Sequence, residues 1–184
     1  IRGAPRRLAA GLLVFAAGCG DDDGTGPTPL SPEEVAGVYR ICSLAFAPSS
    51  RFLPAVDIRA RAFDTASVGV TPPRLKLDAT WTFELEYTPR GQFTDVEHRG
   101  TFATGASRVR LAFARPAEVA PLLLPERVDA EFDAASRLLR IADSGLPFTV
   151  SKGDYEWLLG ESDPGIPPRV EGRLTGRFTA GACP

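Results

Sequence analysis

Apolar and polar residues alternate without a break over fourteen positions, from Leu75 to Thr88, and this is the strongest pattern in the chain. The apolar positions are Leu75, Leu77, Ala79, Trp81, Phe83, Leu85 and Tyr87. Side chains of a strand point alternately to its two faces, so a period of two predicts a strand with one buried and one exposed face. Fourteen residues exceed the usual strand length, and the alternative is two strands bent at Asp78-Ala79-Thr80.

Shorter alternating segments, separated by turn residues, occupy most of the remaining chain. The ranges expected as strands are 38–46, 56–63 (a weaker pattern), 93–103, 108–113, 128–133, 138–142, 147–151 and 169–180. The separating turns are expected at 89–92, 104–106, 134–136 and 143–145, and a loop at 152–168. Helical periodicity is nearly absent apart from one short helical turn, Pro32 to Ala36, which Ser31 caps and Gly37 ends. The pattern predicts an all-β domain, an antiparallel meander of eight to ten strands that forms a closed barrel or a β-sandwich.

The N-terminus has a different pattern, which is typical of a secretory signal. Arg2, Arg6 and Arg7 precede the apolar run Leu8–Ala17, and small residues follow it. Ten apolar residues are too few to span a bilayer of about 30 Å. We therefore expect residues 1–18 to be a signal peptide, the alternative being a buried helix at the start of the domain.

The residues after this run resemble the bacterial lipobox, in which small residues precede a cysteine. Here they are Ala16-Ala17-Gly18-Cys19, with Ala16 where the family prefers Leu. The resemblance implies cleavage after Gly18, a diacylglyceryl thioether on Cys19 and usually N-acylation. Cys19 would then attach the protein to a membrane of the bacterial envelope, in the periplasmic or surface leaflet of the outer membrane. The alternative is an ordinary cleaved signal with Cys19 as a structural thiol.

The segment that follows Cys19 is acidic and rich in Gly and Pro, so it has little to bury. Residues 19–30 are expected to be a lipidated tether, and residues 31–184 the folded domain. The whole chain has 21 basic and 23 acidic residues; loss of residues 1–18 removes three Arg, which leaves 18 against 23, a net charge of −5. Such a balance argues against a nucleic-acid partner, which would require a clustered basic excess.

Cys42 and Cys183 are the remaining thiols if Cys19 carries lipid. In an oxidising compartment they are expected to form a disulfide that ties the first predicted strand to the last, the alternative being two unpaired thiols. A closed meander places its first and last strands side by side. The expected bridge therefore favours the barrel over the sandwich.

The order of these features resembles bacterial lipocalin-like lipoproteins. A lipobox, an acidic tether and a Pro-Glu-Glu turn lead into Gly37-Val38-Tyr39, which opens the first strand, and a meander follows to residue 180. In lipocalins a Gly-x-Trp motif places a ring at the closed end of the barrel beneath an Arg of the last strand. The resemblance implies that Tyr39 takes the place of this ring and that Arg173 or Arg177 is the cation. Tyr in place of Trp is a departure from the family's motif.

Candidate catalytic residues are few. No nucleophile elbow, phosphate loop, zinc-protease motif or dinucleotide fingerprint is present. His98 is the single histidine, which excludes a multi-histidine metal site, and beside Glu97 and Arg99 it is expected on the surface. Glu84 and Glu86 share a strand face about 7 Å apart, a spacing that glycosidases use, but they belong to the polar half of an alternation and are expected in solvent. No catalytic residue, metal or cofactor is predicted.

The apolar strand face is the remaining candidate site, formed by Trp81, Phe83, Leu85 and Tyr87. An eight-stranded barrel is either just filled by its side chains or wide enough for one small ligand. The sequence thus predicts a membrane-anchored envelope lipoprotein, not an enzyme, whose barrel binds a small hydrophobic ligand or has a filled core. The alternative is an anchored β-domain that acts through protein contacts in envelope assembly or enzyme inhibition.

Overall fold

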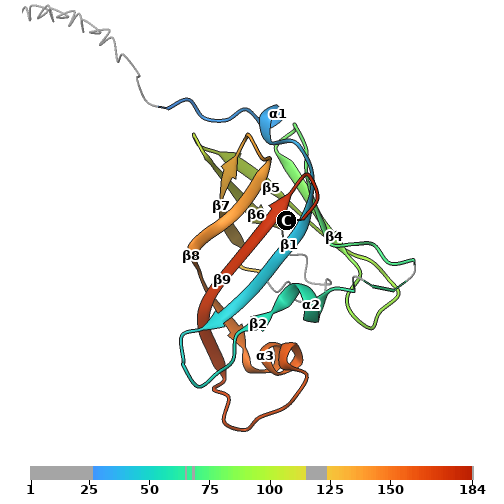
Figure 1. Ribbon diagram of the computed structural model, residues 1–184, viewed down its shortest axis with the longest axis vertical. Coiled ribbons are helices and arrows are strands. Elements are labelled where there is room, and N and C mark those ends of the chain that lie inside the picture. Colours follow the sequence, from blue (N-terminus) through green and yellow to red (C-terminus); the bar gives the residue numbers. More distant parts are fainter. Residues whose placement is uncertain (1–26, 65, 68, 115–123, 184) are drawn as a thin grey trace, which may run out of the picture.

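The computed structural model describes residues 27–64, 66–67, 69–114 and 124–183, and Figure 1 shows how their elements are arranged. The predicted signal peptide, Cys19 and the first part of the tether lie outside the described residues. Within them the strands are β1 (Gly37–Pro48), β2 (Val56–Asp57), β3 (Arg74–Leu77), β4 (Thr82–Tyr87), β5 (Val96–Thr104), β6 (Arg108–Phe113), β7 (Arg127–Asp133), β8 (Leu138–Ser151) and β9 (Arg169–Thr179).

These strands form one antiparallel sheet that closes on itself. Its order is β2-β1-β3-β4-β5-β6-β7-β8-β9, and β1 also pairs with β9, from Arg40 opposite Thr179 to Pro48 opposite Gly172. Over the described part of the chain this is an eight-stranded barrel, with β2 added as a short extra strand beside β1. The expected all-β, lipocalin-like meander is confirmed, and the sandwich alternative is excluded.

The long alternation from Leu75 to Thr88 is two strands, not one. β3 ends at Leu77 and β4 begins at Thr82, and a tight turn joins them. The Asp78 carboxylate accepts hydrogen bonds from the Thr80 backbone and hydroxyl at 3.0 Å each. Trp81 has a positive φ of 65° in this turn, a conformation that no strand residue adopts. The two-strand alternative is therefore correct.

Two short helices lie in segments for which the sequence pattern predicted a strand or a loop. Of the weak strand expected at 56–63, only β2 is a strand, and α2 (Ile58–Ala62) follows it, capped by the Asp57 carboxylate on Ala60 N at 3.0 Å. Within the expected loop 152–168 lies α3 (Lys152–Leu159). The Ser151 hydroxyl caps α3 by accepting from Asp154 N at 3.1 Å. Where the apolar pattern is too short to specify a strand, a side-chain cap at the N-terminus thus stabilises a helix.

The turn expected at 143–145 is a bulge inside one long strand. β8 runs from Leu138 to Ser151, and its register with β9 shifts between Ile141 and Leu146. Arg173 of β9 donates to the carbonyls of Ser144 and Gly145 at 2.9 and 3.1 Å, which replaces part of the interrupted ladder. The bulge lets this strand bend along the barrel without ending.

Helices cover both ends of the barrel (Figure 1). The predicted first helix is present as α1 (Pro32–Val35), with a capping box in which Ser31 and Glu34 bond each other's backbone N–H groups. In Figure 1 α1 lies at the upper end, where the chain enters the barrel, and α2 and α3 lie at the lower end. We call these the α1 end and the α3 end.

Candidate functional site

Three of the four predicted ligand-binding side chains point into the barrel. Phe83, Leu85 and Tyr87 of β4 are buried, each with less than a tenth of its surface exposed. Trp81 does not join them: it stands in the turn before β4, is 42% exposed and packs its ring against Phe102 at 5.5 Å between centroids. The alternation of apolar and polar residues runs through this turn without a break in the sequence. Trp81 therefore stands at an apolar position of the pattern, but its side chain does not point into the barrel.

Aromatic rings fill the barrel at the points where glycines face inward. A β-carbon at Gly100 would stand 2.5 Å from the Phe83 ring, and one at Gly172 would stand 2.6 Å from the Phe46 ring. Each ring therefore occupies the volume that a side chain on the facing strand would otherwise take. Phe83 also packs edge-on against Phe113, with 4.8 Å between ring centroids. These inward rings pack against the facing strands and belong to the hydrophobic core of the barrel.

Tyr39 closes the α1 end, as the lipocalin resemblance implied, but its cation is a different arginine. The Tyr39 ring is fully buried, and its hydroxyl donates to the Val35 carbonyl at 2.6 Å. The guanidinium of Arg137 lies 6.0 Å from the ring centroid and donates to the carbonyl of Ala36. Burial raises the pKa of Tyr39, and the positive charge of Arg137 offsets part of that effect.

The arginines that the resemblance implied lie elsewhere. Arg173 and Arg177 are exposed residues of β9, because Leu174, Gly176 and Phe178 take the inward positions of that strand. Arg137 directly precedes β8 in the turn after β7, with a positive φ of 48°. Turn residues carry no periodic signal, so the sequence pattern did not point to Arg137.

The α3 end is covered by a second tyrosine. Tyr155 of α3 is fully buried, donates its hydroxyl to the Pro54 carbonyl at 2.5 Å and meets the Phe46 ring edge-on at 6.2 Å. Leu158 of α3 and Ile58 of α2 are also fully buried. Both ends of the barrel are thus covered by packed side chains of the described residues.

His98 is buried inside the barrel and not on the surface as expected. Only 3% of it is exposed, and its Nε2 lies 3.2 Å from the Tyr87 hydroxyl. The register of β5 explains this placement, because His98, Gly100 and Phe102 take the inward positions of the strand. Burial raises the pKa of Tyr87 to about 12. Tyr87 and His98 are thus enclosed together in the core of the barrel.

The two remaining cysteines form the expected bridge. Cys42 of β1 and Cys183, beyond the end of β9, are joined by a disulfide, with 5.3 Å between their α-carbons. The bridge spans the seam at which β1 pairs with β9 and the barrel closes. The expected link between the first and last strands is confirmed.

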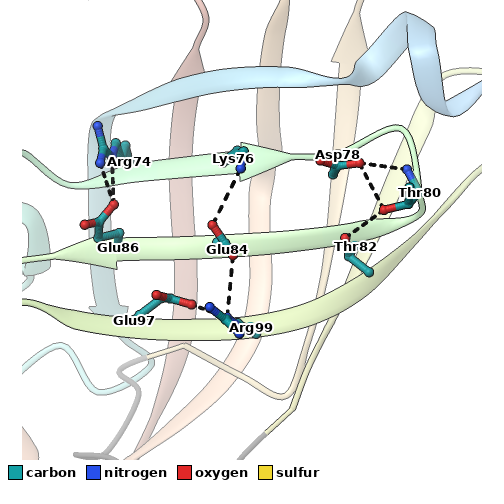
Figure 2. Close-up of polar contacts among 9 residues, drawn as sticks. All are labelled: Arg74, Lys76, Asp78, Thr80, Thr82, Glu84, Glu86, Glu97 and Arg99. Atoms are coloured by element: carbon teal, nitrogen blue, oxygen red, sulfur yellow. Dashed lines mark hydrogen bonds and ion pairs between the residues drawn. The ribbon is translucent and has the colours of Figure 1, made fainter.

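The candidate acid pair Glu84 and Glu86 lies on the outer face of the barrel among basic residues (Figure 2). Glu86 pairs with Arg74 at 2.6 Å, and Glu84 pairs with Lys76 at 3.8 Å and Arg99 at 3.5 Å. Basic side chains on neighbouring strands therefore balance the negative charge of both carboxylates at the surface. This arrangement agrees with the solvated strand face that the sequence pattern predicts for both acids.

A surface cleft beside the disulfide is a feature of the outer face that the sequence did not suggest. Its walls include Arg40 of β1, Arg59 of α2 and Arg74 of β3, and its volume is about 490 Å³. The three arginines are spread over thirty-five positions and meet only when these elements fold together, so no local motif marks them.

No family model, curated protein or solved structure matches the chain. In the part of the chain that the structure describes, no group of three or more His, Cys, Asp and Glu side chains could hold a metal ion. A search of the same residues finds no helix with the length and apolar character needed to cross a bilayer.

Proposed function

We propose that this protein is a lipoprotein of the bacterial envelope, anchored through lipid on Cys19, whose barrel acts through its outer surface. The filled interior supports this choice over a carrier. Ligand pockets for small molecules usually enclose roughly 300 Å³ or more. Here Phe83 and Phe46 occupy the space above Gly100 and Gly172, and both ends are covered.

The arrangement of the barrel fits a tethered domain. The described chain enters at the α1 end, so a tether of residues 19–30 would hold this end toward the membrane and present the α3 end outward (Figure 1). That outward end carries two exposed rings, Phe52 at 82% and Trp157 at 52% exposure. Exposed aromatic side chains are enriched where proteins contact one another. We therefore place the protein partner at the α3 end.

Native mass spectrometry of the purified protein separates surface action from an internal carrier. We expect the mass of the polypeptide with any covalent lipid and no further ligand, because the interior is occupied by its own rings. A stoichiometric co-purified lipid that survives mild activation would overturn the surface proposal and restore the carrier.

Fractionation of cells tests the anchor. Cys19→Ala should move the protein from membranes to the soluble fraction, since the acyl chains supply the membrane affinity, at about 0.8 kcal/mol for each buried methylene. Thr25→Ala is the matched control, because it is a substitution in the same segment of the sequence that leaves Cys19 and the disulfide in place. Membrane retention of the Cys19→Ala protein would contradict lipidation.

A photo-reactive amino acid tests the position of the partner. Placed at Trp157, it should cross-link one envelope protein in intact cells, whereas the same group at the exposed Arg177 of β9 should not. Equal cross-linking at both positions would contradict a partner surface at the α3 end.

A further inference from the structure

The cleft beside the disulfide combines positive charge with apolar walls. Its charged side chains are Arg40, Arg59 and Arg74, and its apolar walls include Val38, Pro72 and Pro73. Among the described residues that line it, none is Asp or Glu. A volume of about 490 Å³ falls within the range of sites for small molecules, roughly 300–1,000 Å³.

Two of the three positive charges are uncompensated. Arg74 forms a two-nitrogen contact with Glu86 at 2.6 and 2.9 Å, which neutralises it. Arg59 uses only its Nε, which donates to the Ile41 carbonyl at 2.7 Å, and an uncharged carbonyl leaves the charge in place. The Arg40 side chain is exposed and makes no ion pair with a described residue. The cleft therefore carries a charge of about +2.

The sheet places like charges opposite each other at this point. Arg40 on β1 is the direct cross-strand neighbour of Arg74 on β3, and its neighbour on β9 is Thr179. On the next strand pair of the same face, Arg74 stands opposite Glu86 and Lys76 opposite Glu84. Like charges directly opposite on a sheet repel, and Glu86 compensates only the charge of Arg74, so an anion bound at Arg40 would stabilise this point of the sheet.

The walls of the cleft are held in place before any ligand arrives. The bond from Arg59 to the Ile41 carbonyl fixes α2 against β1, and the disulfide fixes Cys183 as part of the opposite wall. Pro72 and Pro73 have restricted backbone torsions. A site whose walls are already ordered loses less entropy when it binds a ligand.

We propose that this cleft binds a phosphomonoester group through Arg40 and Arg59, with a short apolar portion of the ligand against Val38 and Pro72. A phosphomonoester carries about −1.5 to −2 charge at pH 7, which matches the two uncompensated guanidinium groups. The guanidinium fork donates two parallel hydrogen bonds to phosphate oxygens. After loss of the signal the chain has a net charge of −5, so the attraction comes from this cluster and not from the overall charge.

Calorimetric titration tests the proposal on the full chain carrying Cys19→Ala, which prevents any acyl chain from binding vesicles. One arm uses glycerol phosphate, and the other uses phosphatidylcholine vesicles with and without phosphatidic acid, all at one ionic strength. Saturable binding of glycerol phosphate identifies a soluble phosphomonoester as the source. Binding to phosphatidic acid vesicles alone identifies a lipid headgroup, and either result supports the site.

Substitutions assign the binding to the cleft. Arg40→Gln, whose side chain has no ion pair to lose, should weaken binding about tenfold, and Arg40→Gln with Arg59→Gln should abolish it. Arg127→Gln is the matched control, an exposed arginine on a strand outside the cleft, and should bind as the parent does. Circular dichroism verifies that each variant is folded.

Three results would overturn the proposal. They are the absence of binding in both arms, equal binding by the double variant and the parent, and tighter binding of succinate than of glycerol phosphate. The last result would assign the cleft to carboxylates.

Discussion

The guanidinium of Arg137 lies over the ring of Tyr39, although the two residues are 98 positions apart in the chain. Arg137 also donates to the carbonyls of Glu34 and Ala36, at the C-terminal end of α1. A single side chain thus connects the first helix, the opening of β1 and the start of β8. It closes the α1 end of the barrel, at which the described part of the chain enters.

Removal of this side chain should destabilise the protein. Arg137→Ala leaves the last carbonyls of α1 without their donor and exposes the edge of the Tyr39 ring, and we expect a loss of about 2 kcal/mol in the free energy of unfolding. Urea denaturation measures it. The control is Arg177→Ala, which alters an exposed arginine of β9 and should change stability by less than about 0.5 kcal/mol. Equal losses in the two variants would show that Arg137 has no special role.

The packing of rings on glycines predicts a steep cost for one added methyl group. In Gly100→Ala the new β-carbon would lie 2.2 Å from the Ala112 carbonyl oxygen and 2.5 Å from the Phe83 ring, so β5 or its neighbours must shift. We expect a loss of about 2–3 kcal/mol, at the upper end of the range for overpacked cores. Thermal and urea unfolding measure this loss.

Gly153→Ala is the matched control for that substitution. Gly153 lies in α3, and a β-carbon there would meet nothing within 4 Å. Alanine should therefore stabilise the protein by about 0.5–1 kcal/mol, because it favours the helix. A tolerated Gly100→Ala would show that the interior has free space, and it would weaken the argument against an internal ligand.

The disulfide should contribute strongly to stability. The bridge closes a loop with a sequence separation of 141, for which the chain-entropy model gives roughly 5 kcal/mol. The double variant Cys42→Ser, Cys183→Ser should lose about 2–5 kcal/mol, measured by urea denaturation. Reduction of the unchanged protein should reproduce the loss. A loss after reduction but not in the double variant would contradict this account.

The buried Tyr87 predicts a fall of stability in alkali. Its pKa is about 12 in the folded protein and near 10 in the unfolded chain, so folding favours the neutral phenol. The contribution is complete below pH 10 and is lost as the pH rises toward 12, by about 2–3 kcal/mol at roughly 1.4 kcal/mol for each pH unit. Tyr87→Phe should therefore lose less stability than the parent between pH 10 and 12. Equal losses in both proteins would falsify this.

Much of the barrel could be predicted because its strands alternate cleanly. The patterns at 108–113 and 128–133 correspond to β6 and β7 within one residue. The helix α2 was missed because Val56 to Phe63 is too short to show a period, and the Asp57 cap decides its structure. The disulfide was predicted from the number of cysteines and from the oxidising compartment expected for them, and it is present.

The site residues were harder to predict because their direction depends on contacts distant in the chain. His98 stands between two charged residues, which suggests a surface position, yet the register of β5 with β4 turns it inward. Trp81 has the parity of the buried residues, yet a positive φ turns it outward. Arg40, Arg59 and Arg74 form a cluster only because β1, β3 and α2 meet. The local sequence pattern predicts where apolar and polar residues alternate along a strand. The contacts that each side chain makes depend on how the barrel closes.

The bridge between Cys42 and Cys183 also affects the response of the protein to proteases. Residues 43–182 lie inside a covalent ring, while the segment that leads to Cys19 lies outside it. A single cut anywhere within the ring would leave both fragments in one molecule. The fragment that carries the N-terminal segment would hold the other, so a nicked protein would stay one covalent molecule until a reductant separated the two fragments.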